Sequence, residues 1–205
     1  GEKFLNEAIK SVLNQSYRNW ELMFWDNKST DKSKKIFKSF KDKRLKYYYT
    51  HKKVSLYESR NAALKKASGK FIPFLDVDDY WFKNKLKKQI IKFKDQNVGL
   101  VYGKYWKINP NNLIRKKQLI AKENLPTGNI TKELLKNYYV GLLTIVIRKK
   151  FLTKHKEVFK VKYNYLGDLD FVLRFSTKYK FDAVQEPIGV YRQHESQMQR
   201  ENFKT

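Results

Sequence analysis

Residues 71–81 read FIPFLDVDDYW, and the prediction of the fold is built outward from this stretch. FIPFL is a short apolar run typical of a buried strand, and Asp76, Asp78 and Asp79 follow it directly. Three like charges this close repel each other unless a cation or basic groups compensate them, and carboxylate oxygens suit Mg²⁺ or Mn²⁺. The pattern favours a divalent-cation site. In the alternative, Asp79 caps the next helix and the other two carboxylates are solvated.

Helical and extended patterns alternate on both sides of this stretch. Apolar spacing predicts helices at residues 4–13, 31–40, 57–67, 83–95, 131–138 and 168–178. Short apolar or aromatic runs predict strands at residues 20–25, 45–49, 71–75, 98–106, 144–148 and 188–192, and a loop with one strand at 110–128. This alternation indicates an α/β fold with a mainly parallel sheet flanked by helices, in which ligands bind beyond the carboxyl ends of the strands.

Composition narrows the possible classes of protein. A chain of 205 residues suits one domain, and 41% hydrophobic residues argue against a disordered chain. The absence of Cys excludes disulfides and thiolate metal sites. The longest strongly apolar run, residues 141–147, is too short to span a bilayer, and no signal peptide is visible. We therefore expect a cytoplasmic protein.

The formal charge of +25, from 45 Lys and Arg against 20 Asp and Glu, has three possible explanations. It reflects compositional drift, attraction to an anionic membrane surface, or nucleic-acid binding. Lysines are spread over every predicted helix instead of forming one block, which favours drift and leaves peripheral membrane contact open. No nucleic-acid partner is expected.

Polar residues that follow other predicted strands are further candidates. Asp26 follows WELMFW, where a carboxylate either accepts hydrogen bonds from a base or ribose or forms an Asx-turn. Asp168 opens a predicted helix, either as a general base or as a cap. Asp170 and Arg174 have the spacing of a surface ion pair.

Basic residues near the last predicted strand suit a phosphate ligand. Arg192 and His194 alternate in YRQHES, so their side chains suit a diphosphate. The chain has neither a GxGxxG nor a GxxxxGK[ST] motif, so a backbone cradle for phosphate is not expected. His51 and His155 lack the neighbours of a zinc motif.

Together these motifs resemble the family 2 glycosyltransferases, an inverting group with the GT-A fold. Residues 25–33, WDNKSTDKS, resemble the family's DDGSTD turn, and residues 58–79 resemble its ARNxG and LDaDD segments. Residues 167–175, GDLDFVLRF, resemble its EDyDlwlRl segment, and residues 187–197 resemble the closing YRxHxxS. Asn27 and Gly167 depart from the pattern, because they stand where the family often has a second Asp and a Glu.

The resemblance implies a role for each matching residue. Asp168 would be the catalytic base, and Asp78 and Asp79 would be ligands of Mn²⁺ or Mg²⁺. The residues expected to bind the donor nucleotide are Asp26, Arg60, Asp76, Arg192 and His194. The partners implied are a nucleoside-diphosphate sugar and a saccharide or lipid-linked acceptor, in the synthesis of a bacterial surface polysaccharide. We expect one domain over residues 1–205, with a donor-binding half at 1–106 and an acceptor and base half at 107–205.

Residues 2–22 resemble the family's first helix and second strand, so the resemblance implies that the opening strand of the sheet is lacking. We expect a strand-wide gap between residues 20–25 and 71–75, poor stability and little activity from such a fragment alone. Apolar side chains are expected to line that gap, namely Leu22, Phe24, Phe71 and Phe74.

Two other functions remain possible from the sequence. A nucleotidyltransferase on a similar sheet would need a Gly-rich loop with Lys and Arg near its N-terminus. A basic nucleic-acid-binding domain would need Lys and Arg gathered on one face with exposed aromatic residues. An acidic cleft lined by Asp26, Asp78 and Asp168 would favour the glycosyltransferase.

Overall fold

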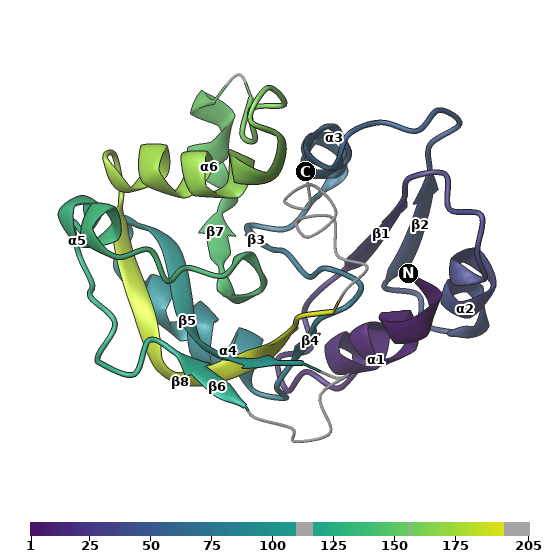
Figure 1. Cartoon of the computed structure of the whole chain (residues 1–205), viewed down its shortest axis with the longest axis horizontal. Helices are drawn as coiled ribbons and strands as arrows, with labels where there is room; N and C mark the ends of the chain where they lie inside the picture. Colours follow the sequence, from purple (N-terminus) through teal and green to yellow (C-terminus); the bar gives the residue numbers. More distant parts are fainter. Residues whose placement is uncertain (110–116, 156, 195–205) are drawn as a thin grey trace.

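Two separate sheets form the framework of the chain in the computed structural model, which describes residues 1–109, 117–155 and 157–194 (Figure 1). Strands β1 (Leu22–Asp26) and β2 (Leu45–Tyr49) form a parallel pair. The other described strands form a six-stranded sheet in the order β3-β7-β5-β8-β4, with β6 paired to β5. Their bounds are Phe71–Pro73 for β3, Tyr80–Trp81 for β4, Val98–Ile108 for β5, Gln118–Ile120 for β6, Val146–Arg148 for β7 and Lys180–Arg192 for β8.

Helices pack around both sheets (Figure 1). The α-helices are α1 (Glu2–Leu13), α2 (Ser33–Ser39), α3 (Leu56–Lys66), α4 (Lys85–Ile90), α5 (Thr131–Lys136) and α6 (Gly167–Ser176). Short 3-10 segments are η1 (Ile91–Lys94), η2 (Leu142–Thr144), η3 (Lys149–Lys154) and η4 (Asn164–Leu166). None of the helices within the described part of the chain is both long enough and apolar enough to cross a bilayer.

The start of α3 shows how local sequence fixes an element that matters for the site. The Ser55 side chain accepts a hydrogen bond from the backbone of Glu58, and the Glu58 side chain accepts one from the backbone of Ser55. This reciprocal capping box satisfies two of the donors that a helix N-terminus leaves unpaired. It fixes the point at which the helix that carries Arg60 begins.

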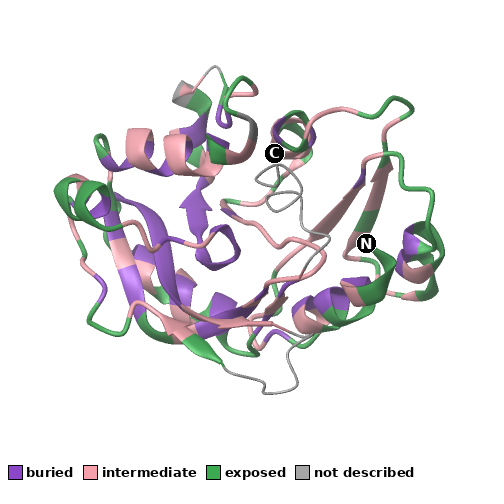
Figure 2. Cartoon of the chain, in the orientation of Figure 1, coloured by how far each residue is buried: buried purple, intermediate pink, exposed green. Residues whose placement is uncertain are grey.

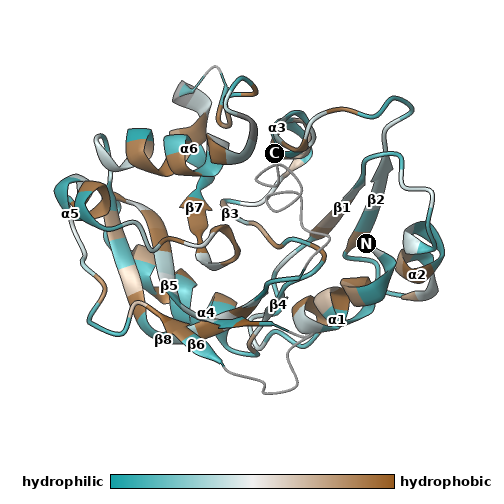
Figure 3. Cartoon of the chain, in the orientation of Figure 1, coloured by the Kyte–Doolittle hydropathy of each residue, from teal (hydrophilic) through white to brown (hydrophobic). Residues whose placement is uncertain are grey.

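Each sheet has its own main core, and a smaller cluster around Val12 and Trp81 joins the two. Leu5 and Ile9 of α1 pack with Phe37 of α2 over the β1–β2 pair. The larger core lies around β5, β7 and β8, where α6 contributes Phe171 and Phe175, both fully buried. Figure 2 shows β7 buried along its length while β1 and β2 are mostly half-buried, and Figure 3 shows that β7 is hydrophobic except at its end.

The α/β fold is confirmed, and its strand pairs are of both kinds. Pairs β1–β2 and β5–β8 are parallel, whereas β3–β7, β5–β7, β4–β8 and β5–β6 are antiparallel. The parallel prediction rested on strands that alternate with helices, which holds for β1, α2 and β2. In the second half, β7 and β4 pair antiparallel to their neighbours, and such pairs need no crossover helix.

Most predicted elements have their counterpart in the structure, with informative differences. Residues 83–95 were predicted as one helix but form α4 and η1, with non-helical dihedral angles at Phe93. Strand β8 begins at Lys180, well before the predicted start at residue 188, and includes Pro187 beside a register shift against β5. Pro73 is accommodated because β3 lies at an edge of the sheet path, where a missing ladder donor costs little. Of the predicted loop at 110–128, residues 110–116 lie outside the described residues.

As predicted, β1 and β3 are not hydrogen-bonded to each other in the described part of the chain, and they belong to different sheets. That four side chains line a slot between them stays a prediction, and each also has packing partners in a core cluster. Leu22 and Phe24 pack with the α1–α2 cluster. Phe71 packs on Phe93, and Phe74 packs on Phe159 in the large core. Leu22 also packs against a third cluster that contains Trp81 of β4, in the other sheet.

Candidate active site

Helix α3 connects the acidic segment after β3 to the start of α6. The Arg60 guanidinium lies 2.6 Å from Asp76 Oδ1, in an ion pair with a largely buried arginine and an aspartate whose side chain is 44% exposed. Burial acts against the charged form of Arg60, but Asp76 and then Asp168 outweigh it, so the pKa of Arg60 is raised. Arg60 is thus close enough to two carboxylates from distant parts of the chain to interact with both.

The end of β8 holds the next two carboxylates. The Arg192 backbone N–H donates to Asp79 Oδ1 at 3.0 Å, and the Arg192 guanidinium donates to the Asp78 carbonyl at 2.7 Å. His194 Nε2 lies 3.0 Å from Asp78 Oδ2. The guanidinium of Arg192 is buried and also pairs with Glu7 of α1. The contacts of Arg192 therefore hold the acidic segment against β8, and the part of the closing motif after His194 lies outside the described residues.

Crowding among the three carboxylates changes their chemistry. Asp79 is 2% exposed, and burial followed by the charges of Asp76 and Asp78 raises its pKa to about 9. Such a set of oxygen donors favours a bound cation, since a cation would relieve the repulsion. Within the residues that the structure describes, no group of three or more acidic or histidine side chains converges closely enough to hold a metal ion. Magnesium sites commonly use one or two carboxylates plus substrate phosphates, so Asp78 and Asp79 fit that smaller requirement.

Asp168 lies in the first turn of α6, and its surroundings differ from those of the acidic segment. The Tyr57 hydroxyl of α3 lies 3.3 Å from Asp168 Oδ1. Burial raises the pKa of Asp168, while backbone N–H groups at the helix start and the charge of Arg60 act in the opposite direction. A partly buried carboxylate with a raised pKa is suited to accept a proton.

Two further tyrosines stand close to this carboxylate. Burial raises the pKa of Tyr105 of β5, and the charges of Asp79 and Asp168 add to that effect. Burial also raises the pKa of Tyr138, which follows α5, with a further contribution from Asp168. Tyr105 therefore lies near both the acidic segment and the start of α6, so the two groups of carboxylates share one region of the molecule.

Asp170 shows that the acidic residues at the start of α6 have different roles. Its Oδ2 forms the expected ion pair with Arg174 at 2.7 Å, one turn along the helix. Arg174 also donates to the Val158 carbonyl at 2.8 Å, which ties α6 to the preceding loop. Asp170 is therefore a structural residue.

Asp26 ends β1 with both carboxylate oxygens bonded to the chain itself. The Ser29 backbone donates to Oδ1 at 2.8 Å, and the Tyr47 hydroxyl donates to Oδ2. The Asx-turn contact, one of the two alternatives that the sequence predicted for Asp26, is thus present. The Asp26 residue is 1% exposed. The neighbouring Asn27 holds the loop before α3, since its side chain both donates to and accepts from the backbone of Val54. A contact between Asp26 and the nucleotide stays a prediction.

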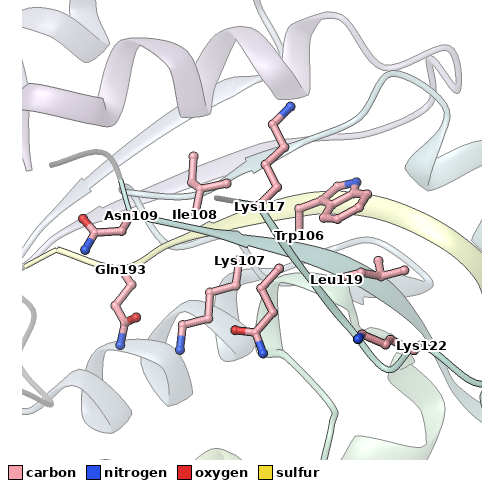
Figure 4. A pocket seen from close by; sticks show the side chains of 9 residues that line it. Trp106, Lys107, Ile108, Asn109, Lys117, Leu119, Lys122 and Gln193 are labelled. Carbon is pink, nitrogen blue, oxygen red and sulfur yellow. The ribbon is translucent and has the colours of Figure 1, made fainter. Parts of the chain in front are cut away.

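A hollow of about 740 Å³ lies at the ends of β5 and β6, and none of these carboxylates is among its lining residues (Figure 4). Trp106, Ile108 and Leu119 are among its lining residues, together with three lysines. Figure 4 shows that the Lys107 and Lys117 side chains point in opposite directions, so they do not converge on one anion. No acidic residue is among the described residues that line the hollow, whereas carboxylates and an arginine lie close together beside α3.

Sequence reasoning missed the residues that support the site. Tyr57 carried a usable signal, because it lies one helical turn before Arg60 and so shares its face of α3. Glu7, Tyr105 and Tyr138 carried none, because their roles depend on contacts between distant segments.

Known proteins share sequence with this chain. A family model described as "Glycosyl transferase family 2" matches residues 1–159, a range that ends before α6. The chain is 38% identical over 164 residues to the Escherichia coli protein named UDP-Glc:alpha-D-GlcNAc-diphosphoundecaprenol beta-1,3-glucosyltransferase WfgD, covering 80% of this chain and 62% of that protein. It is 30% identical over 149 residues to the Bacillus subtilis putative teichuronic acid biosynthesis glycosyltransferase TuaG, covering 72% of this chain and 58% of that protein.

Solved structures share the fold. Residues 1–349 of S. aureus TarS in complex with UDP superpose with a TM-score of 0.78 at 21% identity, covering 95% of this chain and 58% of that one. The mannosyltransferase PcManGT from Pyrobaculum calidifontis, in complex with GDP-Man and Mn²⁺, gives a TM-score of 0.65 at 13% identity, covering 93% and 53%. The chain thus spans less than two thirds of the length of these relatives, has a GT-A α/β fold and belongs to glycosyltransferase family 2.

Proposed function

We propose that this chain forms the donor-binding and base-bearing part of an inverting glycosyltransferase. The single observation that carries the proposal is Arg60, which pairs with Asp76 of the acidic segment and interacts with Asp168. The group suited to bind a charged donor and the group suited to remove a proton therefore flank the same guanidinium. Family membership supplies the reaction class, and the roles of the individual residues are proposed from their geometry.

The proposed reaction is one displacement at the anomeric carbon of a nucleoside-diphosphate sugar. Asp168 takes the proton from an acceptor hydroxyl as its oxygen forms the new bond to that carbon. The bond from the carbon to the diphosphate oxygen breaks, and the nucleoside diphosphate leaves with that electron pair. One displacement inverts the configuration. A divalent cation, when bound through Asp78 and Asp79, would neutralise charge on the leaving diphosphate.

The chain's own residues provide the remaining functions. Arg192 and the end of β8 keep Asp78 and Asp79 in place. His194 contacts Asp78, and the His194 imidazole is proposed to approach the diphosphate from there. Asp76 is the most exposed of the three carboxylates in the acidic segment. It is proposed to contact the donor while Arg60 restrains it.

The acceptor is proposed to be a saccharide carried on a lipid. The name of the relative WfgD refers to a sugar on diphosphoundecaprenol, and the name of TuaG refers to teichuronic acid. The formal charge of +25 suits a cytoplasmic protein at an anionic membrane surface. Sedimentation of the whole protein with vesicles tests this location. Binding to anionic vesicles that disappears at high salt supports it, and equal binding to neutral vesicles contradicts it.

The reaction itself is tested with the whole protein and a panel of nucleoside-diphosphate sugars. We expect one donor to raise the melting temperature only with Mn²⁺ or Mg²⁺, and EDTA to remove the shift. The product made from that donor should have the inverted anomeric configuration by NMR. Retained configuration would refute the single displacement. Pyrophosphate release from a nucleoside triphosphate would support a nucleotidyltransferase instead.

A further inference from the structure

The hydroxyl of Tyr57 lies at the point where α6 begins. It accepts a hydrogen bond from the Gly167 backbone at 2.9 Å and is 3.4 Å from the Asp168 backbone nitrogen, which also donates to it. Tyr57 is 5% exposed, and its ring stacks on Phe159. A side chain from α3 thus satisfies donors that the N-terminus of α6 leaves unpaired.

These contacts determine where the phenolic proton points. Two backbone N–H groups donate to the Tyr57 oxygen, so its one proton is left for an acceptor. Asp168 Oδ1, at 3.3 Å, is the acceptor that the structure provides. Donors that polarise a hydroxyl strengthen the bond that it donates in turn. The hydroxyl therefore connects the start of α6 to the Asp168 carboxylate.

Gly167 makes this arrangement possible. A Cβ atom at position 167 would lie 2.6 Å from Cε2 and 2.7 Å from Cζ of Tyr57, closer than real atoms approach. Any side chain at this position would push the ring away from α6. The Tyr57 ring therefore packs directly against Gly167, although the two residues come from distant parts of the sequence.

The same helix sets the position of the acidic segment. Arg60, one turn after Tyr57, pairs with Asp76. Asn61 donates to the Phe159 carbonyl at 2.7 Å and accepts from the Phe159 backbone N–H at 3.0 Å, which fixes α3 against the loop before α6. A shift of Tyr57 would therefore change the position of Asp168 relative to Asp76.

We propose that Tyr57 is a positioning residue for the base, whose hydroxyl orients the Asp168 carboxylate in the space that Gly167 leaves open. This inference rests on the proposed function of Asp168. The charged and titratable groups that interact with Asp168 are Tyr57 and Arg60 of α3, Asp76 after β3, Tyr105 of β5 and Tyr138 after α5. Of these, Tyr57 has the hydroxyl that donates to the carboxylate.

The test is Tyr57→Phe in the whole protein, which keeps the ring and removes the hydroxyl. We expect kcat to fall about tenfold to hundredfold, as for the loss of a hydrogen bond to a charged group. The donor dissociation constant should stay within about twofold. The acid limb of the kcat–pH profile should move to higher pH, because loss of the donor destabilises the ionised carboxylate. Tyr102→Phe is the matched control, since that buried hydroxyl donates to the Pro126 carbonyl and should leave the profile unchanged.

A double-mutant cycle separates this inference from the proposed function. In an Asp168→Asn background, Tyr57→Phe should have little further effect on kcat. Normal turnover in Asp168→Asn alone would refute the proposed function. Loss of turnover in Asp168→Asn, together with a wild-type rate and pH profile in Tyr57→Phe, would refute only the positioning role.

A second variant covers the case in which Tyr57→Phe does not fold. Replacing Tyr57 with 3-fluorotyrosine keeps the ring and the hydroxyl and makes the hydroxyl a stronger donor. The acid limb should then move to lower pH, because a stronger donor favours the ionised carboxylate. An unchanged acid limb in a folded fluorotyrosine protein would contradict the inference.

Discussion

Helix α3 touches two acidic segments, and their carboxylates are held in different ways. In the segment after β3, each carboxylate has a basic residue as partner: Asp76 pairs with Arg60, Asp78 contacts His194, and Asp79 accepts from the Arg192 backbone. At the start of α6, Asp170 pairs with Arg174. Among the side chains that the structure describes, no Lys, Arg or His forms an ion pair with Asp168 within 4 Å.

This difference separates two kinds of acidic site. Carboxylates with basic residues as partners suit the binding of a cation and a diphosphate. Asp168, whose hydrogen-bond partners are a hydroxyl and helix N–H groups and whose pKa is raised by burial, is suited to accept a proton. The contrast predicts that substitutions in the two segments have different kinetic consequences.

The largest effect is expected from Asp78→Asn. Mn²⁺-dependent turnover should fall about a thousandfold or more, because loss of a ligand removes stabilisation from the leaving group. Asp42→Asn removes a carboxylate from a surface pair with Arg44 and is the matched control. Initial rates across a Mn²⁺ titration give the measurement. An Asp78→Asn protein as active as the control would mean that this segment holds no catalytic metal.

The pH profile should distinguish the base from an ordinary aspartate. Since burial raises the pKa of Asp168, the base is protonated and turnover is lost as pH falls, with an inflection above the usual ~3.9 of Asp. Arg60 acts in the opposite direction, so Arg60→Met should move the inflection to still higher pH. Lys65→Met, which removes an exposed charge from the same helix, serves as control. Coincident profiles for Arg60→Met and Lys65→Met would contradict the coupling between α3 and Asp168.

A smaller, structural effect is expected from Gly167→Ala. The added methyl would collide with the Tyr57 ring, and overpacking of this kind costs about 1–3 kcal/mol of unfolding free energy. Urea denaturation measures that loss, and kcat should fall as in Tyr57→Phe. Gly69→Ala adds a methyl where the nearest atom is 3.3 Å away and should be milder. Equal stabilities and rates for the two alanine variants would mean that Gly167 has no special role.

Local patterns predicted the elements of the fold and part of the site. The run that ends in Asp76, Asp78 and Asp79 could be placed after a strand because apolar and acidic residues are adjacent in the sequence. Strand β8 was recognised only near its end, because Pro187 and Glu186 interrupt the strand pattern that the pairing with β5 restores. Local patterns also could not give the partners of strands that pair without a crossover helix.

Local patterns also could not predict the residues that hold the site in place, because their roles depend on contacts between distant segments. Gly167 could be treated only as a departure from a family pattern, and its role becomes evident when the Tyr57 ring lies against it. Arg192 suggested a phosphate ligand, whereas its guanidinium is buried against Glu7 and the Asp78 carbonyl. The division of the chain into halves at residue 106 stays a prediction.

The central claim is that Asp168 performs the chemistry while the acidic segment binds the donor. The most direct test compares Asp168→Asn with Asp170→Asn in the whole protein, by calorimetric titration of the sugar-nucleotide donor with Mn²⁺ and by single-turnover transfer. Asp168→Asn should bind the donor within about twofold of wild type and transfer the sugar about 10²–10⁴-fold more slowly, while Asp170→Asn keeps the wild-type rate. Weakened donor binding with a normal transfer rate in Asp168→Asn would contradict the account.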